Sequence, residues 1–268
     1  MTRSLPKSLL LPLRLGLILF VSLFWGMGCG TAMLSDENLA KRAKRDFNRM
    51  KGKETLSTNA SHNKMIKEIG ERIAGVAQVD LPGTEWEFVV FEKKEANAFA
   101  MPGGKVGVYS GLIELADGDA DEIAVVIGHE IAHVSFRHSN KRMTQAMGIA
   151  LGGVILNAAL RDKDSTDRRL ATGAYAAGTT LGMTLPYSRE NEREADHRGL
   201  FYSAMAGYDP RAAIRFWSKM KKSGKRLPEI FSTHPNPGKR IEFLESHMDR
   251  AYALYVEAKN ARGEKPNP

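Results

Sequence analysis

Two histidines and a glutamate stand close together in the stretch His-Glu-Ile-Ala-His at 129–133. Residues four apart project from the same side of a helix, so the imidazoles of His129 and His133 can share one metal ion. The surrounding residues, 123–134, are almost all apolar, which predicts that this helix is buried. Buried polar groups without partners are costly, and a divalent metal removes that cost.

We therefore predict that His129 and His133 bind one Zn²⁺ ion per chain, with Glu130 as general base toward a metal-activated water. The alternative is a buried histidine pair satisfied by hydrogen bonds alone. The third histidine of the extended motif is missing, because Phe136 stands where that motif has glycine and His138 falls one residue short of its last position. A third ligand must come from elsewhere in the chain.

A cluster of acids at 188–198 can supply that ligand. On a helix, Glu190 and Glu194 share one face, and Glu194 leads on to Arg198 at i+4, the spacing of an exposed ion pair. Glu192 lies on the other side with Asp196, among small and apolar residues that suit packing against another helix. We predict Glu192 as the third metal ligand and Asp196 as the acid that orients a ligating histidine. A charged surface helix is the alternative.

The elements that position these residues are indicated by hydrophobic period and by turn residues. Asp119 can cap the metal-binding helix, with Glu122 as the returning half of a capping box. The predicted elements are helices at about 35–50 and 60–77, strands at 86–91, 98–100 and 105–109, and helices from about 119 onward with breaks at 161–169 and 234–238. The fold class is therefore α+β: a mainly helical domain with a small antiparallel sheet beside the metal-binding helix.

The segment Met143–Leu160 carries no charged side chain. That composition allows a helix in a membrane, but Thr144, Gln145 and Asn157, together with three glycines, suit a buried or mobile helix better. We therefore expect a buried or mobile helix here rather than one inserted in a membrane.

Composition excludes several classes of protein. The chain has 268 residues, of which 43% are hydrophobic and 26% charged, and this is typical of a globular protein. Its single cysteine excludes an internal disulfide framework and a multi-cysteine metal site. The net charge of +8 selects no partner by itself, and without a glycine-rich phosphate loop or a basic patch interleaved with aromatics we expect no nucleic-acid partner.

The N-terminus has the pattern of an export signal. Three basic residues precede an uncharged apolar run that ends just before Cys29, so we predict a signal peptide over 1–28. The segment resembles a bacterial lipoprotein signal, which implies that Cys29 is acylated and anchors the protein to the periplasmic face of a membrane, by resemblance the outer one. A plain signal peptide with an incidental cysteine is the alternative. We expect a catalytic domain over 29–258 and a disordered tail over 259–268.

Four motifs occur in the order in which one known family has them. They are Asn-Ala-Phe-Ala-Met-Pro-Gly-Gly from 97, His-Glu-Ile-Ala-His followed by Arg137-His138, Ser-Arg-x-x-Glu-x-Glu-Ala-Asp from 188, and Thr-His-Pro from 233. Over about 35–250 the chain resembles the CAAX prenyl endopeptidase and HtpX-like zinc metalloproteases, above all their small exported lipoprotein members. The resemblance implies a gluzincin fold, and it implies Glu192 as the third zinc ligand.

The Thr-His-Pro motif makes His234 a further candidate. In composition alone it is a loop histidine that hydrogen-bonds a neighbouring backbone group. The resemblance implies that its loop lies near the zinc. There His234 has two possible roles, stabilising the oxyanion in catalysis or occupying the open metal position in a resting state.

The function expected from these residues is that of a zinc endopeptidase of the bacterial cell envelope, which the resemblance places in protein quality control. Its substrates would be extended or unfolded polypeptides, and the strand at 105–109 could bind them by β-addition. The alternative function is a non-proteolytic envelope chaperone or assembly factor that retains a structural zinc. The presence of Glu130 favours the protease, because a structural site needs no general base.

Overall fold

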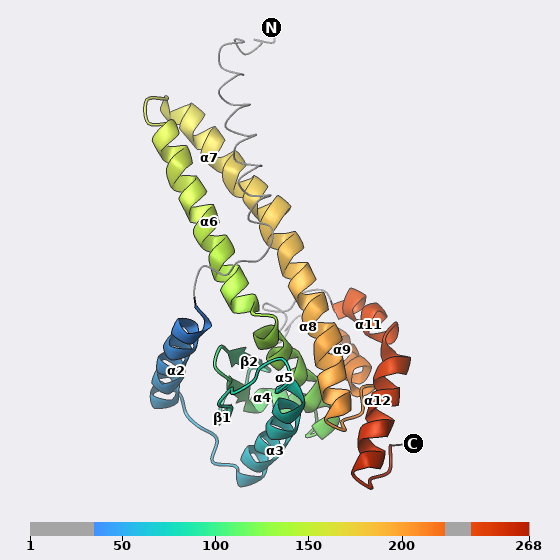
Figure 1. Cartoon of the computed structure of the whole chain (residues 1–268). Helices are drawn as coiled ribbons and strands as arrows, with labels where there is room; N and C mark the ends of the chain where they lie inside the picture. The colour runs from blue at the N-terminus through green and yellow to red at the C-terminus, as the bar shows by residue number, and fades with distance from the viewer. Residues whose placement is uncertain (1–34, 223–236, 268) are drawn as a thin grey trace. The chain divides into compact units, whose positions relative to one another are not determined.

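The computed structural model describes residues 35–222 and 237–267 (Figure 1). The predicted signal peptide, Cys29 and His234 lie outside the described residues. The elements are α2 (Asp36–Lys53), α3 (Ala60–Ala77), β1 (Glu87–Phe91), β2 (Ala98–Met101), β3 (Lys105–Tyr109), α4 (Ser110–Leu115), α5 (Ala120–Ser135), α6 (His138–Ala159), α7 (Ser165–Thr179), the π-helical turn η1 (Thr180–Thr184), α8 (Leu185–Met205), α9 (Ala212–Lys222), α11 (Pro237–Glu245) and α12 (Met248–Ala261). A mainly helical chain with one small sheet confirms the α+β class.

The first two helices begin at side-chain caps. The Ser35 hydroxyl accepts a hydrogen bond from the main-chain N–H of Asn38 at 3.3 Å, and α2 follows. Asn59 caps α3 in the same way, accepting from the main-chain N–H groups of Ser61 and His62. The helix predicted over about 60–77 is confirmed by the bounds of α3.

The sheet is mixed rather than wholly antiparallel, which corrects the sequence prediction. Its strand order is β1-β3-β2; β2 pairs with β3 antiparallel, whereas β1 pairs with β3 in parallel. Gly103 and Gly104, both at positive φ, form the tight turn that joins β2 to β3. After β1 the chain crosses to the far side of the sheet and forms β2 there. β3 then runs back between the two strands, parallel to β1. Because β3 is the central strand, its predicted role in β-addition is wrong.

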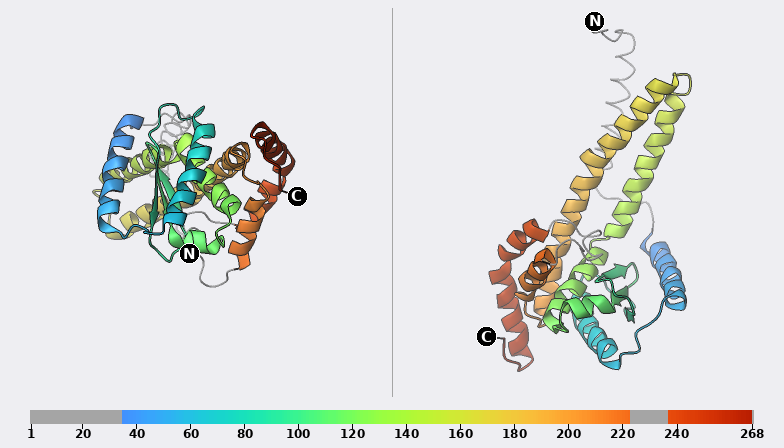
Figure 2. Two further views of the ribbon diagram at one scale, coloured as in Figure 1. Left: turned by 90° about the horizontal axis from the view of Figure 1, so that it is seen from below. Right: turned by 180° about the vertical axis from the view of Figure 1, so that it is seen from behind.

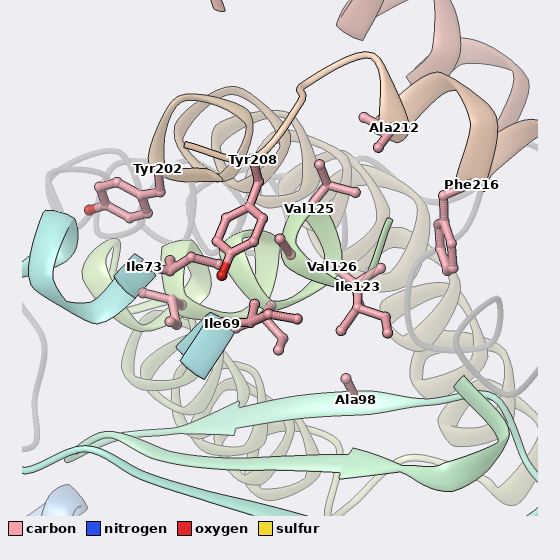
Figure 3. Packing of buried hydrophobic residues seen from close by; sticks show 14 of the residues in the cluster. Ile69, Ile73, Ala98, Ile123, Val125, Val126, Tyr202, Tyr208, Ala212 and Phe216 are labelled. Carbon is pink, nitrogen blue, oxygen red and sulfur yellow. The ribbon is translucent and has the colours of Figure 1, made fainter. Parts of the chain in front are cut away.

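The core lies around α5, which packs against α8 most extensively and also against α3, β2 and α9. Figure 3 shows Ile123 and Val126 of α5 among side chains of α3, α9 and the sheet. Every residue from Glu122 to His133 is buried. This confirms the buried helix that the apolar run predicted, and it places the His-Glu-Ile-Ala-His stretch inside the protein.

Apart from Gly152, no residue of the segment Met143–Leu160 is buried, so the buried alternative for this helix is wrong. It belongs to α6, which runs beside α7 away from the sheet and from α5 (Figures 1 and 2). Large apolar side chains of α6 lie exposed at i, i+4, i+7 and i+8: Met147, Leu151, Val154 and Ile155. Over 35–222 and 237–267, no helix combines the length and apolar character needed to cross a bilayer.

The C-terminal segment also differs from the prediction of a disordered tail. Helix α12 continues to Ala261. After it, the main-chain N–H of Asn267 donates to the Tyr255 hydroxyl at 2.8 Å, and Arg211 donates to the Asn267 carbonyl at 3.2 Å. The polar composition of the tail indicated disorder. The structure instead gives the tail a hydrogen-bond partner in the buried Tyr255 of α12, and composition does not reveal such a contact.

The exposed face of α6 can be tested by stability. Leu151 is 61% exposed whereas Ile127 of α5 is 0% exposed. Leu151→Ala should change the free energy of unfolding by no more than about 0.5 kcal/mol, and Ile127→Ala should lower it by about 2–5 kcal/mol because it opens a cavity. Urea denaturation followed by circular dichroism measures both. Similar losses in the two variants would show that the α6 face is covered in solution.

Candidate metal centre and its supporting residues

The helix that carries the motif is fixed at its start by Asp119. Its carboxylate accepts hydrogen bonds from the main-chain N–H groups of Asp121 and Glu122 at 2.9 and 3.2 Å, so the predicted cap is confirmed. The Glu122 side chain contacts Lys219 Nζ at 3.0 Å, which differs from the predicted capping box. The reason is tertiary, because α9 brings a lysine and Arg215 to the buried end of this side chain.

Three buried side chains converge at the middle of α5 and α8. His129 Nε2 lies 3.0 Å from His133 Nε2, and each of these nitrogens lies 3.4 Å from a carboxylate oxygen of Glu192. These three residues form the one metal-binding group found among the described residues. A tetrahedral zinc with bonds of about 2.1 Å separates its ligand atoms by about 3.4 Å. The donor set and spacing therefore fit zinc, and the structure places the predicted ligands together.

Two glycines allow α5 and α8 to approach closely enough for this geometry. A Cβ atom on Gly128 would lie 2.7 Å from the main-chain oxygen of Gly199, and one on Gly199 would lie 2.6 Å from the main-chain nitrogen of His129. Gly199 follows Glu192 by seven residues, so it lies on the same face of α8. The backbones can therefore meet only because neither position carries a side chain, and this contact presents Glu192 to the histidines.

Asp196 lies where the sequence predicted it. Its carboxylate is 3.1 Å from His129 Nδ1, the nitrogen that does not face the metal group. Arg240 of α11, which sequence analysis missed, donates to Asp196 through Nε at 2.8 Å and lies 3.4 Å from Glu192. Burial alone would raise the pKa of Asp196, but the Arg240 charge and the His129 hydrogen bond bring that pKa below its usual value.

Arg240 is itself held by an aromatic ring. Its guanidinium lies 3.7 Å from the centre of the Trp217 ring on α9, and its side chain is buried. A buried arginine between two carboxylates limits the cost of removing all three charges from water. The sequence signal for Arg240 was its place just after the proline- and glycine-rich break, but nothing in the sequence connected it with Asp196.

His138 and Glu194 also differ from the sequence expectation. Glu194 does not form an ion pair with Arg198 among the contacts described; its Oε2 lies 2.9 Å from His138 Nε2 and 3.7 Å from Lys141 Nζ. His138 Nδ1 in turn lies 2.7 Å from His133 Nδ1. Burial lowers the pKa of His138, while Glu194 opposes that shift. The histidine that falls short of the extended motif therefore touches a ligand instead of being one.

Glu130 is buried beside His129 on α5 but does not belong to the three-ligand group. A cavity of about 720 Å³ opens next to the site, with His133, Val134 and Ser135 of α5 in its lining. Pro102 and Gly103, which directly follow β2, line the same cavity. The end of β2 and a metal ligand thus border one space.

The fold and the site define a class of protein. Two histidines and a carboxylate on two packed helices leave a fourth position of a tetrahedral zinc for water or substrate, which is the composition of a catalytic rather than a structural site. Glu130, next to the first histidine, is not in this group and has the position from which a glutamate can act as a base in the His-Glu-x-x-His motif. This combination is that of a zinc metallopeptidase.

Comparison with known proteins agrees with that class. The model of peptidase family M48 matches residues 60–248. Mitochondrial metalloendopeptidase OMA1 of Arabidopsis thaliana is 35% identical over 192 residues, covering 70% of this chain and 37% of the relative. OMA1 of Saccharomyces cerevisiae is 32% identical over 190 residues, covering 66% and 51%. The β-barrel assembly-enhancing protease of Escherichia coli K12 is 29% identical over 219 residues, covering 78% and 43%.

The chain belongs to peptidase family M48, a family of metalloendopeptidases that use zinc. The matched residues contain α5 and α8 with all three metal-binding side chains. The chain spans only about half the length of these relatives or less. The comparisons therefore establish the family, whereas substrates and partners are matters of proposal.

The contact between Gly128 and Gly199 can be tested with one methyl group. Gly199→Ala should force α8 away from α5, weaken zinc binding, and lower the free energy of unfolding by about 1–3 kcal/mol. Gly75→Ala is the matched control, because a Cβ there meets nothing within 4 Å in α3; it should stabilise the helix by up to about 1 kcal/mol. Chelator competition and urea denaturation measure the two effects. Wild-type zinc affinity in Gly199→Ala would contradict this account.

Proposed function

We propose that this chain is a zinc-dependent endopeptidase of the bacterial cell envelope that hydrolyses peptide bonds in extended or unfolded polypeptides. The observation that carries the proposal is the buried group of His129, His133 and Glu192 with Glu130 next to it on α5. A structural site would have no use for that glutamate. Membership of a peptidase family supports the same reaction.

His129, His133 and Glu192 would hold the zinc. When bound, the metal supplies Lewis acidity, which polarises a carbonyl and lowers the pKa of water toward neutrality. Glu130 accepts the proton of the attacking water and delivers it to the amine that leaves as the peptide bond breaks. Asp196 holds His129 in place through Nδ1, and Arg240 keeps Asp196 ionised.

Substrate binding is best supported along β2. It is an edge strand of the sheet, and its main-chain groups at Ala98 and Ala100 point away from β3, because Phe99 and Met101 face the bonded positions of the antiparallel pair. The Asn97 side chain accepts from the Ala98 N–H at 3.0 Å, whereas the Ala100 N–H faces the outer edge of the sheet. An extended peptide can add at this edge and continue into the cavity that the residues after β2 share with His133.

The envelope location and the quality-control role are supported by a relative's name and by the N-terminal pattern. The β-barrel assembly-enhancing protease of Escherichia coli supports an envelope function by its name, and the export pattern before Cys29 supports a lipoprotein at the periplasmic face, with the outer membrane as the proposed location. The four motifs support the small exported type within the CAAX prenyl endopeptidase and HtpX-like group. For His234, which lies outside the described residues, the oxyanion and occluding roles both stay predictions.

Removal of the base should separate catalysis from metal binding. Glu130→Gln should keep about one zinc per chain and lose casein hydrolysis, because the glutamate is not among the ligands. Glu192→Ala should lose the zinc, whereas the control Glu190→Ala, at an exposed position of α8, should keep both zinc and activity. Metal analysis and a casein assay with and without chelator measure this. Zinc-loaded wild type without peptidase activity would favour the non-proteolytic chaperone.

The anchor has its own test. In cells that export the protein, Cys29→Ser should abolish incorporation of labelled fatty acid and leave an unacylated precursor, because the thiol is the only site for the lipid in this chain. Wild-type protein is the control. Mature wild-type protein that carries no lipid would decide for a plain signal peptide.

A further inference from the structure

The two ligating histidines are held in different ways at the nitrogen that faces away from the metal group. His129 Nδ1 lies 3.1 Å from Asp196, so an acid holds it directly. His133 Nδ1 lies 2.7 Å from another imidazole, that of His138, whose Nε2 lies 2.9 Å from the carboxylate of Glu194. His133 is therefore supported by two side chains in series, His138 and Glu194, whereas His129 is supported by Asp196 alone.

We propose that Glu194, acting through His138, fixes the tautomer and the ring orientation of His133 for metal binding. The proposal rests on the zinc function proposed above. It assigns distinct tasks to the two glutamates of the Glu-x-Glu segment: Glu192 belongs to the metal-binding group, and Glu194 positions His133, another member of that group, through His138.

When His133 binds a metal, only one placement of the ring protons satisfies the hydrogen bonds from His133 through His138 to Glu194. A metal takes the lone pair of His133 Nε2, so the proton of the neutral ring must be on Nδ1, which then donates to His138 Nδ1. His138 must accept at Nδ1 and carry its own proton on Nε2. That proton can be donated only to an acceptor, and the Glu194 carboxylate at 2.9 Å is one. A single carboxylate thus sets the protons of two rings.

The backbone is bent to make this contact. His138 is the first residue of α6, yet it returns toward His133 of α5 because Arg137 between the helices adopts a left-handed conformation with φ of 58°. Such a conformation is unfavourable for a residue with a side chain. Arg137 is held there by Asp36 of α2, which accepts from its Nε at 2.8 Å. This unfavourable turn is what brings the His138 ring to His133.

The packing around His138 leaves little freedom for the ring. The side chain is 1% exposed, and it stacks on Phe136 with ring centres 5.5 Å apart and planes 11° from parallel. Lys141 Nζ lies 3.7 Å from the same oxygen of Glu194 that His138 contacts, so a second cationic side chain faces this carboxylate. Glu194 is itself one-third exposed, so substitutions there should be tolerated by the fold.

The experiment measures zinc affinity rather than activity. The dissociation constant for zinc, from competition with a chromophoric chelator, should rise about 10- to 100-fold in Glu194→Ala and in His138→Leu. Glu194→Gln and His138→Gln should recover most of the affinity, because an amide oxygen can accept at either place. Glu190→Ala is the matched control: it removes an exposed carboxylate one turn away on the same helix and should leave the affinity unchanged.

A second measurement reports on geometry. The visible absorption of the Co²⁺-substituted protein depends on ligand arrangement, so it should change in Glu194→Ala and not in Glu190→Ala. Circular dichroism of the metal-free variants verifies folding, and Glu194→Ala carries the test if His138→Leu does not fold. Zinc affinity and Co²⁺ spectrum in Glu194→Ala equal to those of the control would overturn the proposal. Failure of the wild type to bind zinc would instead overturn the proposed function.

Discussion

The close contact of α5 and α8 is the constraint on which the rest of the structure depends. Gly128 and Gly199 bring the two backbones together, and this contact places Glu192 and Asp196 against the imidazoles of α5. Other elements support that pair: the sheet and α3 cover α5 on one side, and α9, α11 and α12 pack around α5 and α8 on the other. The helices thus form a frame in which one helix supplies nitrogens and the other supplies carboxylates.

Burying these groups creates an electrostatic problem that the fold solves locally. Two carboxylates of α8 are nearly inaccessible, and Arg240 lies between them with its guanidinium on Trp217. Because ions are costly to remove from water, each must face an opposite charge or a strong donor. The imidazoles and Arg240 provide these partners, and a bound cation would complete the compensation. Asp196 and His138 contact the Nδ1 atoms of His129 and His133, so the Nε2 atoms of both rings are the nitrogens that face Glu192.

Much of the centre could be predicted because helices impose a fixed spacing on their side chains. A difference of four residues puts His129 and His133 on one side, and the same rule separates Glu192 and Asp196 from Glu190. The cap at Asp119 and the bounds of α3 follow from equally local rules. Local rules could not place Met143–Leu160, because an uncharged helix with exposed Leu151 and Val154 has the same composition as a buried one.

The sequence by itself indicated which side chains could form the candidate metal centre, and it located the helices that carry them, since the spacing within each helix depends only on residues within a few turns of one another. Only the tertiary structure decided that Arg240 of α11 pairs with Asp196, that Glu194 contacts His138, and that β3 lies between β1 and β2. The reason is physical. Such contacts join segments that are distant along the chain or turned back by an unusual backbone angle, and they depend on how the packed elements fit together, which no local period or spacing encodes.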